Sequence, residues 1–345
     1  MVMTSDIPPA QPHAAAPTRQ IHLPTPPTGT ESIPVSFDAV YNWDYRVQRQ
    51  DLRNLYEKSK DALWNARTEL AWDTNVDPEA ECMPDQTLMI YGSPLWDKLD
   101  KKTELPKLRR LSMAYTLSNF LHGEQGALLA TSQIVSAVPG TDAKFYASTQ
   151  VMDEARHVEA YDRYLREKYE TVFPISPYLR AVLDEIITES RWDMKYLGMQ
   201  ILVEGLALAA FGYIQHLSTE PLIKQIVHMI MQDEARHVAF GVMSLKGIYA
   251  EMSEGELRQR EDLILESSRL MRDRFLHHEV WECMGMPVNQ CVKIAMESET
   301  MVVFRTMLFS KIVPNVKRLG LLTPRVRKGF EELGVIQFES WDASA

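Results

Sequence analysis

Cysteine is scarce in this chain of 345 residues, which contains only Cys82, Cys283 and Cys291. The number is odd and no Cys-x-x-Cys pair occurs, so the sequence argues against both a disulfide framework and a thiolate metal site. We therefore expect a protein of a reducing cytosol.

An excess of positive charge is also missing. The net charge of −10 at pH 7 gives no electrostatic basis for binding nucleic acid or an anionic membrane. The N-terminus lacks the basic start and continuous apolar core of a signal peptide. The longest apolar stretch, residues 201–214, is interrupted by Glu204 and is too short to cross a bilayer. We expect a soluble, cytoplasmic protein without a nucleic-acid or membrane partner.

No segment alternates polar and apolar residues for long enough to predict a sheet. Eight of the 19 prolines fall within residues 1–36, and this composition predicts a flexible tail over residues 1–40. Residues 41–104 are expected to hold a helix, at about 46–71, and loops that pack on the rest of the protein.

Residues 105–250 contain four apolar-rich helical segments, separated by clusters of Pro, Gly, Ser and Thr. Short connections after the first and third segments make antiparallel hairpins, which favours a four-helix bundle. Residues 251–345 are expected to add C-terminal helices and a tail. The four segments are predicted at 107–137, 143–169, 178–217 with a break near 190, and 221–250.

One string of six residues occurs twice inside these helices. Asp-Glu-Ala-Arg-His-Val at 153–158 recurs unchanged at 233–238. Each copy follows an isolated Glu on an apolar helix by the same interval of 30 residues. A single Glu-x-x-His pair would be a weak signal, but a duplicated pair at equal spacing is a specific one. The spaced pairs are Glu124 with Glu154, and Glu204 with Glu234.

This spacing predicts a site for two metal ions. A helix that runs about 13 residues past the first Glu and returns covers roughly 20 Å each way, so both carboxylates reach one level. Residues three apart share a helix face, which adds a His from each repeat. Crowded carboxylates in an apolar interior repel one another, and two divalent cations such as iron or manganese remove that cost. The predicted ligands are Glu124, Glu154, His157, Glu204, Glu234 and His237.

Charged residues beside the ligands are expected to support the site. A metal-bound His usually donates its other N–H to a carboxylate. Asp153 and Asp233 are placed so that each can serve the His of the opposite hairpin, with Arg156 and Arg236 as counter-ions. Surface salt bridges are the alternative interpretation of these four residues.

In this order and spacing, the six ligands resemble the ferritin-like superfamily of di-iron carboxylate proteins. The Asp-Glu-x-Arg-His form looks most like the oxygen-activating branch, which includes the ribonucleotide reductase small subunit, its ligand-binding oxidase relatives and the multicomponent monooxygenases. The resemblance covers about residues 105–250. It implies an all-α, ferritin-like four-helix bundle with additional N- and C-terminal helices, and a cofactor of two Fe ions or an Mn/Fe pair.

Some positions depart from particular groups of this superfamily. Multicomponent hydroxylases have a Thr where this chain has Leu208, acyl-carrier desaturases have a Thr at Ala207, and arylamine N-oxygenases have a third His at Ile230. Tyr161, one turn after His157, stands where the reductase subunit has its radical Tyr, and it is also an ordinary core position. Three polar residues near the ligands either line a substrate pocket or bond to backbone: Gln133, Gln150 and Gln215.

The resemblance implies a di-iron oxygenase or oxidase that uses O2 to oxidise a small organic substrate, by hydroxylation, N-oxidation or a related reaction. No flavin or ferredoxin module is visible, so a separate reductase is expected to supply electrons, and a homodimer is plausible for this superfamily. Two rivals remain: a radical-generating subunit that uses Tyr161, and an iron-binding ferroxidase without an organic substrate.

Overall fold

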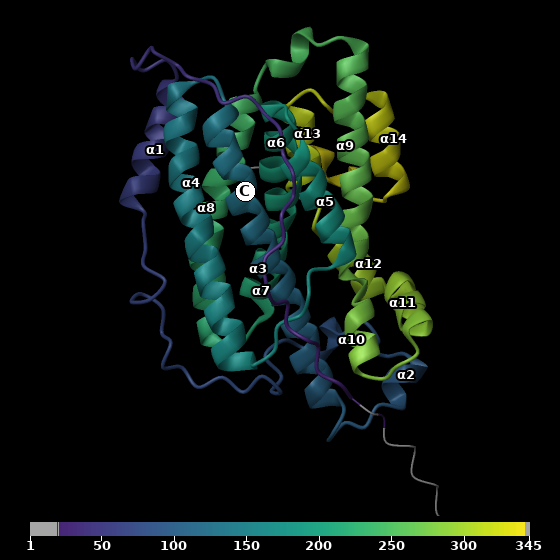
Figure 1. Cartoon of the computed structure of the whole chain (residues 1–345). Helices are drawn as coiled ribbons and strands as arrows, with labels where there is room; N and C mark the ends of the chain where they lie inside the picture. Colours follow the sequence, from purple (N-terminus) through teal and green to yellow (C-terminus); the bar gives the residue numbers. More distant parts are fainter. Residues whose placement is uncertain (1–18, 20, 342–345) are drawn as a thin grey trace, which may run out of the picture.

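The computed structural model describes residue 19 and residues 21–341, and none of these lies in a β-strand. The protein is all-α, a ferritin-like four-helix bundle with further helices before and after it (Figure 1). The predicted fold class is therefore confirmed. The bundle helices are α3 Leu105–Ala137, α4 Thr141–Tyr164, α7 Glu204–Leu217 and α8 Pro221–Leu245.

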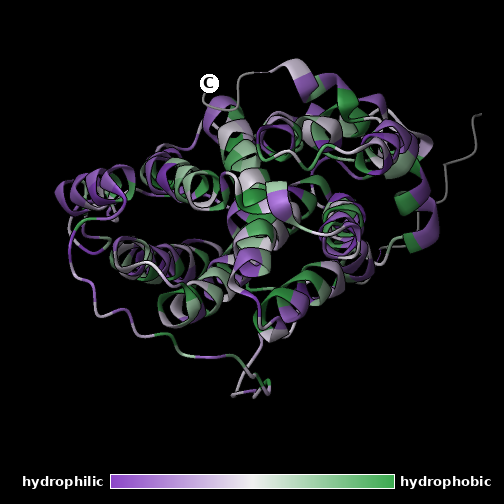
Figure 2. Ribbon diagram, turned by 90° about the horizontal axis from the view of Figure 1, so that it is seen from above, coloured by the Kyte–Doolittle hydropathy of each residue, from purple (hydrophilic) through white to green (hydrophobic). Residues whose placement is uncertain are grey.

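Two antiparallel hairpins form the bundle. Pro139 and Gly140 separate α3 from α4, and residues 218–220 separate α7 from α8. Glu220 caps α8, because its carboxylate accepts hydrogen bonds of 2.7 Å from the backbone N–H groups of both Leu222 and Ile223. Seen from above, the hydrophobic sides of the helices turn inward (Figure 2), so the ligand-bearing faces point into a shared core.

The helix that precedes α7 is broken, as predicted near residue 190. It consists of α5 Pro177–Thr188, α6 Trp192–Tyr196 and a π-helical segment, η3 Leu197–Val203, that continues into α7. Lys195 stabilises the break, since its buried Nζ donates to the carbonyls of Ile186 and Ile187 at 3.0 and 3.1 Å. These are carbonyls at the end of α5 that the helix itself leaves unpaired. Burial lowers the pKa of Lys195 to about 8.

The helix predicted over residues 46–71 is wrong in its extent. The observed helix is α1 Gln50–Asp61, and residues 65–73 form turns. Asn65 explains the difference, because its side chain accepts from the backbone N–H of Arg67 at 2.9 Å and fixes a local turn in place of a helix. The periodic apolar residues remain buried all the same, with Leu70 only 5% exposed.

Two other predicted helices end early. The segment predicted to reach 169 leaves α-helical geometry after Tyr164 and closes with a π-helical turn, η2 Leu165–Tyr169. The segment predicted to reach 250 ends at Leu245, because Gly247 adopts a left-handed φ of 83°.

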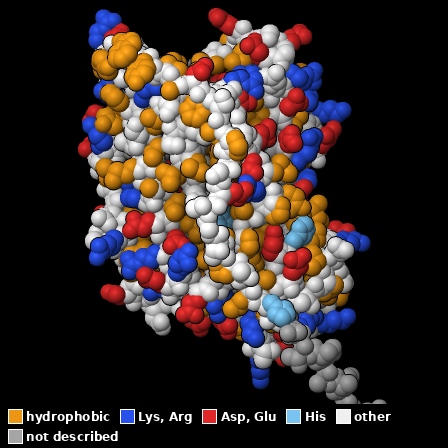
Figure 3. All heavy atoms as spheres, in the orientation of Figure 1, with side chains coloured by type: hydrophobic (Ala, Val, Ile, Leu, Met, Phe, Trp, Pro, Cys, Tyr) orange, Lys and Arg blue, Asp and Glu red, His pale blue; other side chains and the backbone are white. Residues whose placement is uncertain are grey.

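The segment before α1 has no regular secondary structure but lies along the molecule. The backbone of His22 donates to Cys283 O at 2.8 Å, Glu31 pairs with Arg180 at 2.7 Å, and Val40 donates to Ser136 O at 2.9 Å. Figure 3 shows a strip of backbone running down this face. Most of the predicted flexible tail, residues 1–18 and 20, lies outside the described residues, so its flexibility stays a prediction.

The C-terminal helices form a second layer beside the bundle (Figure 1). Phe338, near the end of the chain, is buried at 4% exposure, so the end of the described chain is packed. The remaining elements are η1 Asp85–Thr87, α2 Pro94–Asp97, η4 Ile248–Glu251, α9 Glu254–Asp273, η5 Arg274–Leu276, α10 His278–Cys283, α11 Val288–Glu297, α12 Glu299–Met307, α13 Ile312–Arg318, α14 Pro324–Glu332 and η6 Ile336–Ser340.

One helical run, Trp192–Leu217, is long and apolar enough to cross a membrane by length and composition alone. However, 72% of its most apolar window is buried inside the molecule. A core helix of a soluble protein has this property, and the run includes η3 and α7 of the bundle.

Candidate metal centre

The six predicted ligand side chains meet in the bundle interior, and none is more than 5% exposed. The Nδ1 atom of His157 lies 3.2 Å from Glu124 Oε2 and 3.5 Å from Glu154 Oε2. The same nitrogen lies 3.2 Å from Glu234 Oε1. A carboxylate of the second hairpin therefore reaches the His of the first.

The second His has a matching environment. His237 Nδ1 lies 3.2 Å from Glu154 Oε1 and 3.5 Å from Glu234 Oε1. Two clusters with the spacing of a metal site result, and they share Glu154. The first contains Glu124, Glu154, His157 and Glu234, and the second contains Glu154, Glu204 and His237.

The hydrogen-bonding state of these side chains fits a pair of metal ions. Both carboxylate oxygens of Glu234, one of Glu154 and one of Glu204 are buried without a hydrogen-bond partner among the described residues. Such groups are costly unless something binds them. Burial, together with the neighbouring carboxylates of Glu234 and Glu154, raises the pKa of Glu204 well above its usual value. The arrangement therefore has the donor set, the vacant lone pairs and the excess of negative charge that two divalent cations would satisfy.

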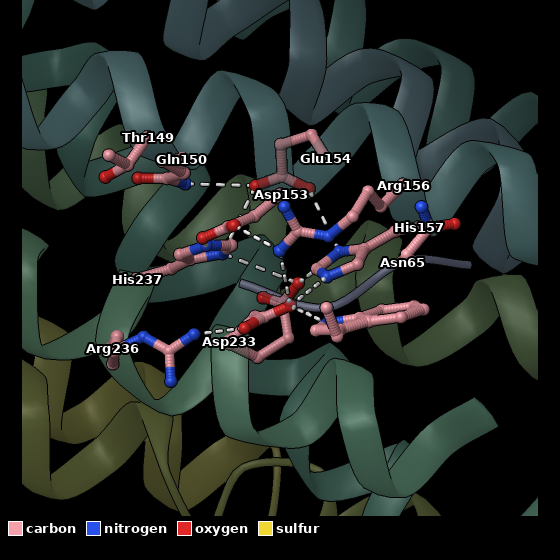
Figure 4. A network of polar contacts seen from close by, with 12 residues as sticks. Asn65, Thr149, Gln150, Asp153, Glu154, Arg156, His157, Asp233, Arg236 and His237 are labelled. Carbon is pink, nitrogen blue, oxygen red and sulfur yellow. Dashed lines mark hydrogen bonds and ion pairs between the residues drawn. The ribbon is translucent and has the colours of Figure 1, made fainter. Parts of the chain in front are cut away.

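Each His is also held from behind by an Asp of the other hairpin. His157 Nε2 lies 3.1 Å from Asp233 Oδ2, and His237 Nε2 lies 3.1 Å from Asp153 Oδ2 (Figure 4). This contact leaves Nδ1 of each ring directed at the carboxylates. The placement is the one expected from the hairpin geometry, and the surface salt-bridge alternative is excluded for Asp153 and Asp233, which are 0% and 1% exposed.

The two predicted Arg residues bind these Asp side chains. Arg156 Nη2 donates to Asp153 Oδ1 at 2.5 Å and to Asp233 Oδ2 at 3.3 Å, and Arg236 donates to Asp233. Burial alone would raise the pKa of Asp233, but the hydrogen bond and charge of His157 hold it well below the usual range. Asp233 is therefore ionised and fixes the ring of His157.

Sequence reasoning missed Trp64 as part of this network. Trp64 Nε1 donates to Asp233 Oδ2 at 2.7 Å, and its ring stacks 6.4 Å from that of His157. A contact between residues 169 positions apart leaves no periodic signal in the sequence.

The three Gln residues singled out from the sequence differ in role. Gln150 Nε2 donates to Glu154 Oε1 at 3.1 Å and to Glu204 Oε1 at 2.9 Å, so it touches the site. Gln133 accepts from Lys195 Nζ at 2.5 Å. Gln215 lines a groove on the outside of α7 and α8.

Tyr161 is fully buried, and its hydroxyl has no hydrogen-bond partner among the described residues. Its ring lies 5.9 Å from that of Phe120 and 6.1 Å from that of Phe211. Burial, helped by the Glu124 carboxylate, raises the pKa of Tyr161 well above 10. The side chain is therefore a neutral phenol below the site, and its redox role stays a prediction.

A small cavity adjoins the carboxylates on this side. It has a volume of about 20 Å³ and is lined by Glu124, Glu204, Glu234, Phe120 and Arg274, among others. Arg274 is 4% exposed, and no carboxylate forms an ion pair with it among the described residues. It follows α9, outside the repeat, where no pattern in the sequence singled it out.

Phe120 also lines a larger cavity of about 100 Å³ that extends toward the protein surface. Its walls are mainly apolar and include Met113, Phe275 and Phe304. The ring of Phe120 packs edge-on against Phe211 at 4.7 Å. One aromatic side chain therefore separates the carboxylate cavity from an apolar one.

Solved structures of R2-like ligand-binding oxidases are similar to this chain. One, a mutant with an anaerobically reconstituted Mn/Fe cofactor, is 15% identical, covers 78% of this chain and 93% of its own, and has a TM-score of 0.48. Another, with a metal cofactor after photoconversion, is 16% identical, with coverages of 78% and 93% and a TM-score of 0.46. No curated protein sequence matches the chain.

A much longer match in sequence comes from a protein family. Residues 46–320, which include the whole bundle and every predicted ligand, match the family described as P-aminobenzoate N-oxygenase AurF. Ile230, where a third His was expected for arylamine N-oxygenases, does not place the chain outside this family. The chain belongs to the p-aminobenzoate N-oxygenase AurF family and is an O2-activating oxidoreductase of the ferritin-like di-iron superfamily.

Proposed function

We propose that this protein binds its two metal ions, iron with iron or manganese with iron, through the six buried side chains, and oxidises a small organic acid with O2. The observation that carries the proposal is the convergence of four carboxylates and two imidazoles whose lone pairs are otherwise unused. Glu154 and Glu234 are the bridging ligands, since each lies within 3.5 Å of both His Nδ1 atoms. Glu124 and Glu204 are terminal ligands.

The protein's own groups have distinct roles. Metal ions held there supply the redox chemistry that activates O2. Asp153 and Asp233 hold the two imidazoles in the tautomer that leaves Nδ1 free to bind. The apolar wall formed by Phe120 and Phe211 limits the entry of water to the reacting centre.

Arg274 identifies the class of substrate. Burial lowers its pKa to about 10, so it is still a cation at neutral pH. A buried cation without a paired carboxylate is unfavourable, and a planar guanidinium recognises a carboxylate through two hydrogen bonds. The p-aminobenzoate named for the family carries such a group. The acid group would reach Arg274, and the body of the substrate would occupy the apolar cavity beyond Phe120.

Replacing Arg274 with Met is expected to weaken the binding of benzoate to the metal-loaded protein by about 10- to 100-fold, the value of charged hydrogen bonds of about 1.5–3 kcal/mol. Binding of benzyl alcohol should change little. Titration calorimetry measures both. Arg272→Met is the matched control, because Arg272 already pairs with Asp273 at 2.6 Å. Equal benzoate affinity in the wild type and the Arg274 variant would remove the organic-acid assignment.

The remaining assignments are also part of the proposal. A separate reductase supplies the electrons, and the protein acts in the cytoplasm, which agrees with the absence of disulfides among its three cysteines. The chain is expected to form a homodimer. The Glu and His ligands alone would also suit a ferroxidase, but Arg274 beside a cavity favours an organic substrate.

The first experiment is to load the protein anaerobically with ferrous iron, count metals per chain and record the optical spectrum on mixing with O2. About two metals per chain and an O2-dependent spectral change are expected. A stable radical signal that disappears in Tyr161→Phe would instead support the radical-generating alternative. Failure to retain metal would contradict the proposed function.

A further inference from the structure

The repeat that supplies the ligands also relates the two core layers on either side of them. Its two copies are 80 residues apart. One layer, below the ligands, is apolar and tightly packed: its rings are in contact at 4.7 to 6.1 Å. This layer consists of Phe120, Tyr161, Phe211 and Ile230.

The equivalent positions in the other copy form the second layer, and these are polar or lack a side chain. A shift of 80 residues converts Phe120 to Gln200 and Tyr161 to Gly241, and the reverse shift converts Phe211 to Thr131 and Ile230 to Gln150. All four helices of the bundle contribute, and Thr131, Gln150 and Gln200 are 0% exposed. The duplicated halves have thus diverged into a dry layer and a polar layer.

The polar layer is incompletely hydrogen-bonded. Both amide atoms of Gln200, the hydroxyl of Thr131 and Oε1 of Gln150 have no partner within the described part of the chain. Buried groups of this kind are normally satisfied by ordered water. Gly241 fixes the position of Gln200, since a Cβ there would lie 2.6 Å from Gln200 Cβ. Gln150 connects the layer directly to Glu154 and Glu204.

Buried hydroxyl groups continue this layer toward the protein surface. Tyr146 and Tyr196 precede Glu154 and Glu204 by eight residues each, and both rings contact Phe240, at 4.4 and 5.0 Å. Their hydroxyls, and that of Ser244, also have no hydrogen-bond partner in the region described. At the outer end, the half-exposed Arg49 donates to the carbonyl of Met243 at 2.9 Å.

We propose that the polar layer and the hydroxyls beyond it hold a file of water molecules that conducts protons from the Arg49 end of the bundle to the Glu154 and Glu204 carboxylates. This inference rests on the proposed function. When one oxygen atom of O2 enters the substrate and the other leaves as water, two protons and two electrons are consumed. The electrons come from the reductase, and the protons travel along this file, opposite to the side from which the substrate enters.

Gln200→Leu tests the proposal because it removes both open amide atoms while keeping an apolar side chain of similar size. In a high-resolution crystal structure, the wild type should show ordered water within hydrogen-bonding distance of Gln200, and the variant should lose it. The variant should bind the same amount of metal and melt no lower, since an unpaired polar group has been removed. Its oxidation by O2 from the ferrous state should slow by at least about tenfold, with a larger solvent isotope effect.

Gln215→Leu is the control for the exchange itself, because Gln215 faces the outer groove. Tyr146→Phe provides a second test that removes only a hydroxyl, and it should also slow the reaction without loss of metal. A dry polar layer in the wild-type crystal, or an unchanged rate and isotope effect in both variants, would overturn the proposal. A wild type that binds no metal would contradict the proposed function, whereas the crystallographic water would still decide whether the layer is hydrated.

Discussion

Glu154→Ala is expected to abolish the binding of both metal ions and to lower the O2-dependent oxidation rate by at least about 1,000-fold, a rise in barrier of about 4 kcal/mol. Glu154 contributes one oxygen to each side of the site, with Oε1 3.2 Å from His237 Nδ1 and Oε2 3.5 Å from His157 Nδ1. Its loss therefore opens both coordination spheres at once. Metal content after anaerobic loading and desalting measures the effect.

Two other variants make this expectation specific. Glu124 contacts only His157, at 3.2 Å, so Glu124→Ala should keep one metal ion per chain. Glu159→Ala, at an exposed position of the same helix, should keep both. The metal-free Glu154 variant should also melt higher than the metal-free wild type, because one of four crowded carboxylates has gone. Full metal content in Glu154→Ala would contradict its assignment as a bridging ligand.

Metal removal is expected to make the stability of the protein strongly dependent on pH. Burial, with neighbouring carboxylates, raises the pKa values of Glu154 and Glu204, and contacts with carboxylates raise those of His157 and His237 despite burial. Groups with a raised folded-state pKa stabilise the fold below their unfolded pKa and lose that contribution as pH rises. The metal-free protein should therefore melt progressively lower from about pH 5 to pH 8.

Bound metal should reverse this dependence. It displaces the shared protons, so affinity rises with pH. At a free concentration 100 times the dissociation constant, each site adds about 2.7 kcal/mol, and two sites should raise the melting temperature by on the order of 10 °C. Calorimetry with and without Mn²⁺, across this pH range, measures both slopes. A metal-free protein that becomes more stable toward pH 8 would show that the cluster does not share protons as described.

The ligands and the paired Asp residues could be predicted because they depend on helical periodicity and on a repeat. A spacing of 30 residues fixes which carboxylates share a level, and a spacing of three fixes which His shares their face. The crossing of Asp153 and Asp233 to the opposite His follows from the same hairpins. Such features are local in each helix, so one sequence is enough to predict them.

The groups that surround the ligands could not be predicted in this way. Trp64 lies in a turn set by Asn65, where the apolar spacing suggested a helix. Arg274 reaches the site from the end of α9, 40 residues beyond Glu234 and outside any repeat. The π-helical η3, which brings Gln200 into the core, likewise has no periodic pattern of its own. Their positions depend on packing between elements far apart in the chain.

The hydrogen bond from Trp64 to Asp233 also has a consequence for the order in which the newly made protein matures. A ribosome that adds roughly 5–20 residues per second completes Asp233 about 8–34 s after Trp64. The first hairpin can close long before then, while the segment that contains Trp64 waits without its partner. His22 waits longer still for Cys283. The N-terminal segment is thus the first part of the chain to be synthesised and among the last to reach its native place.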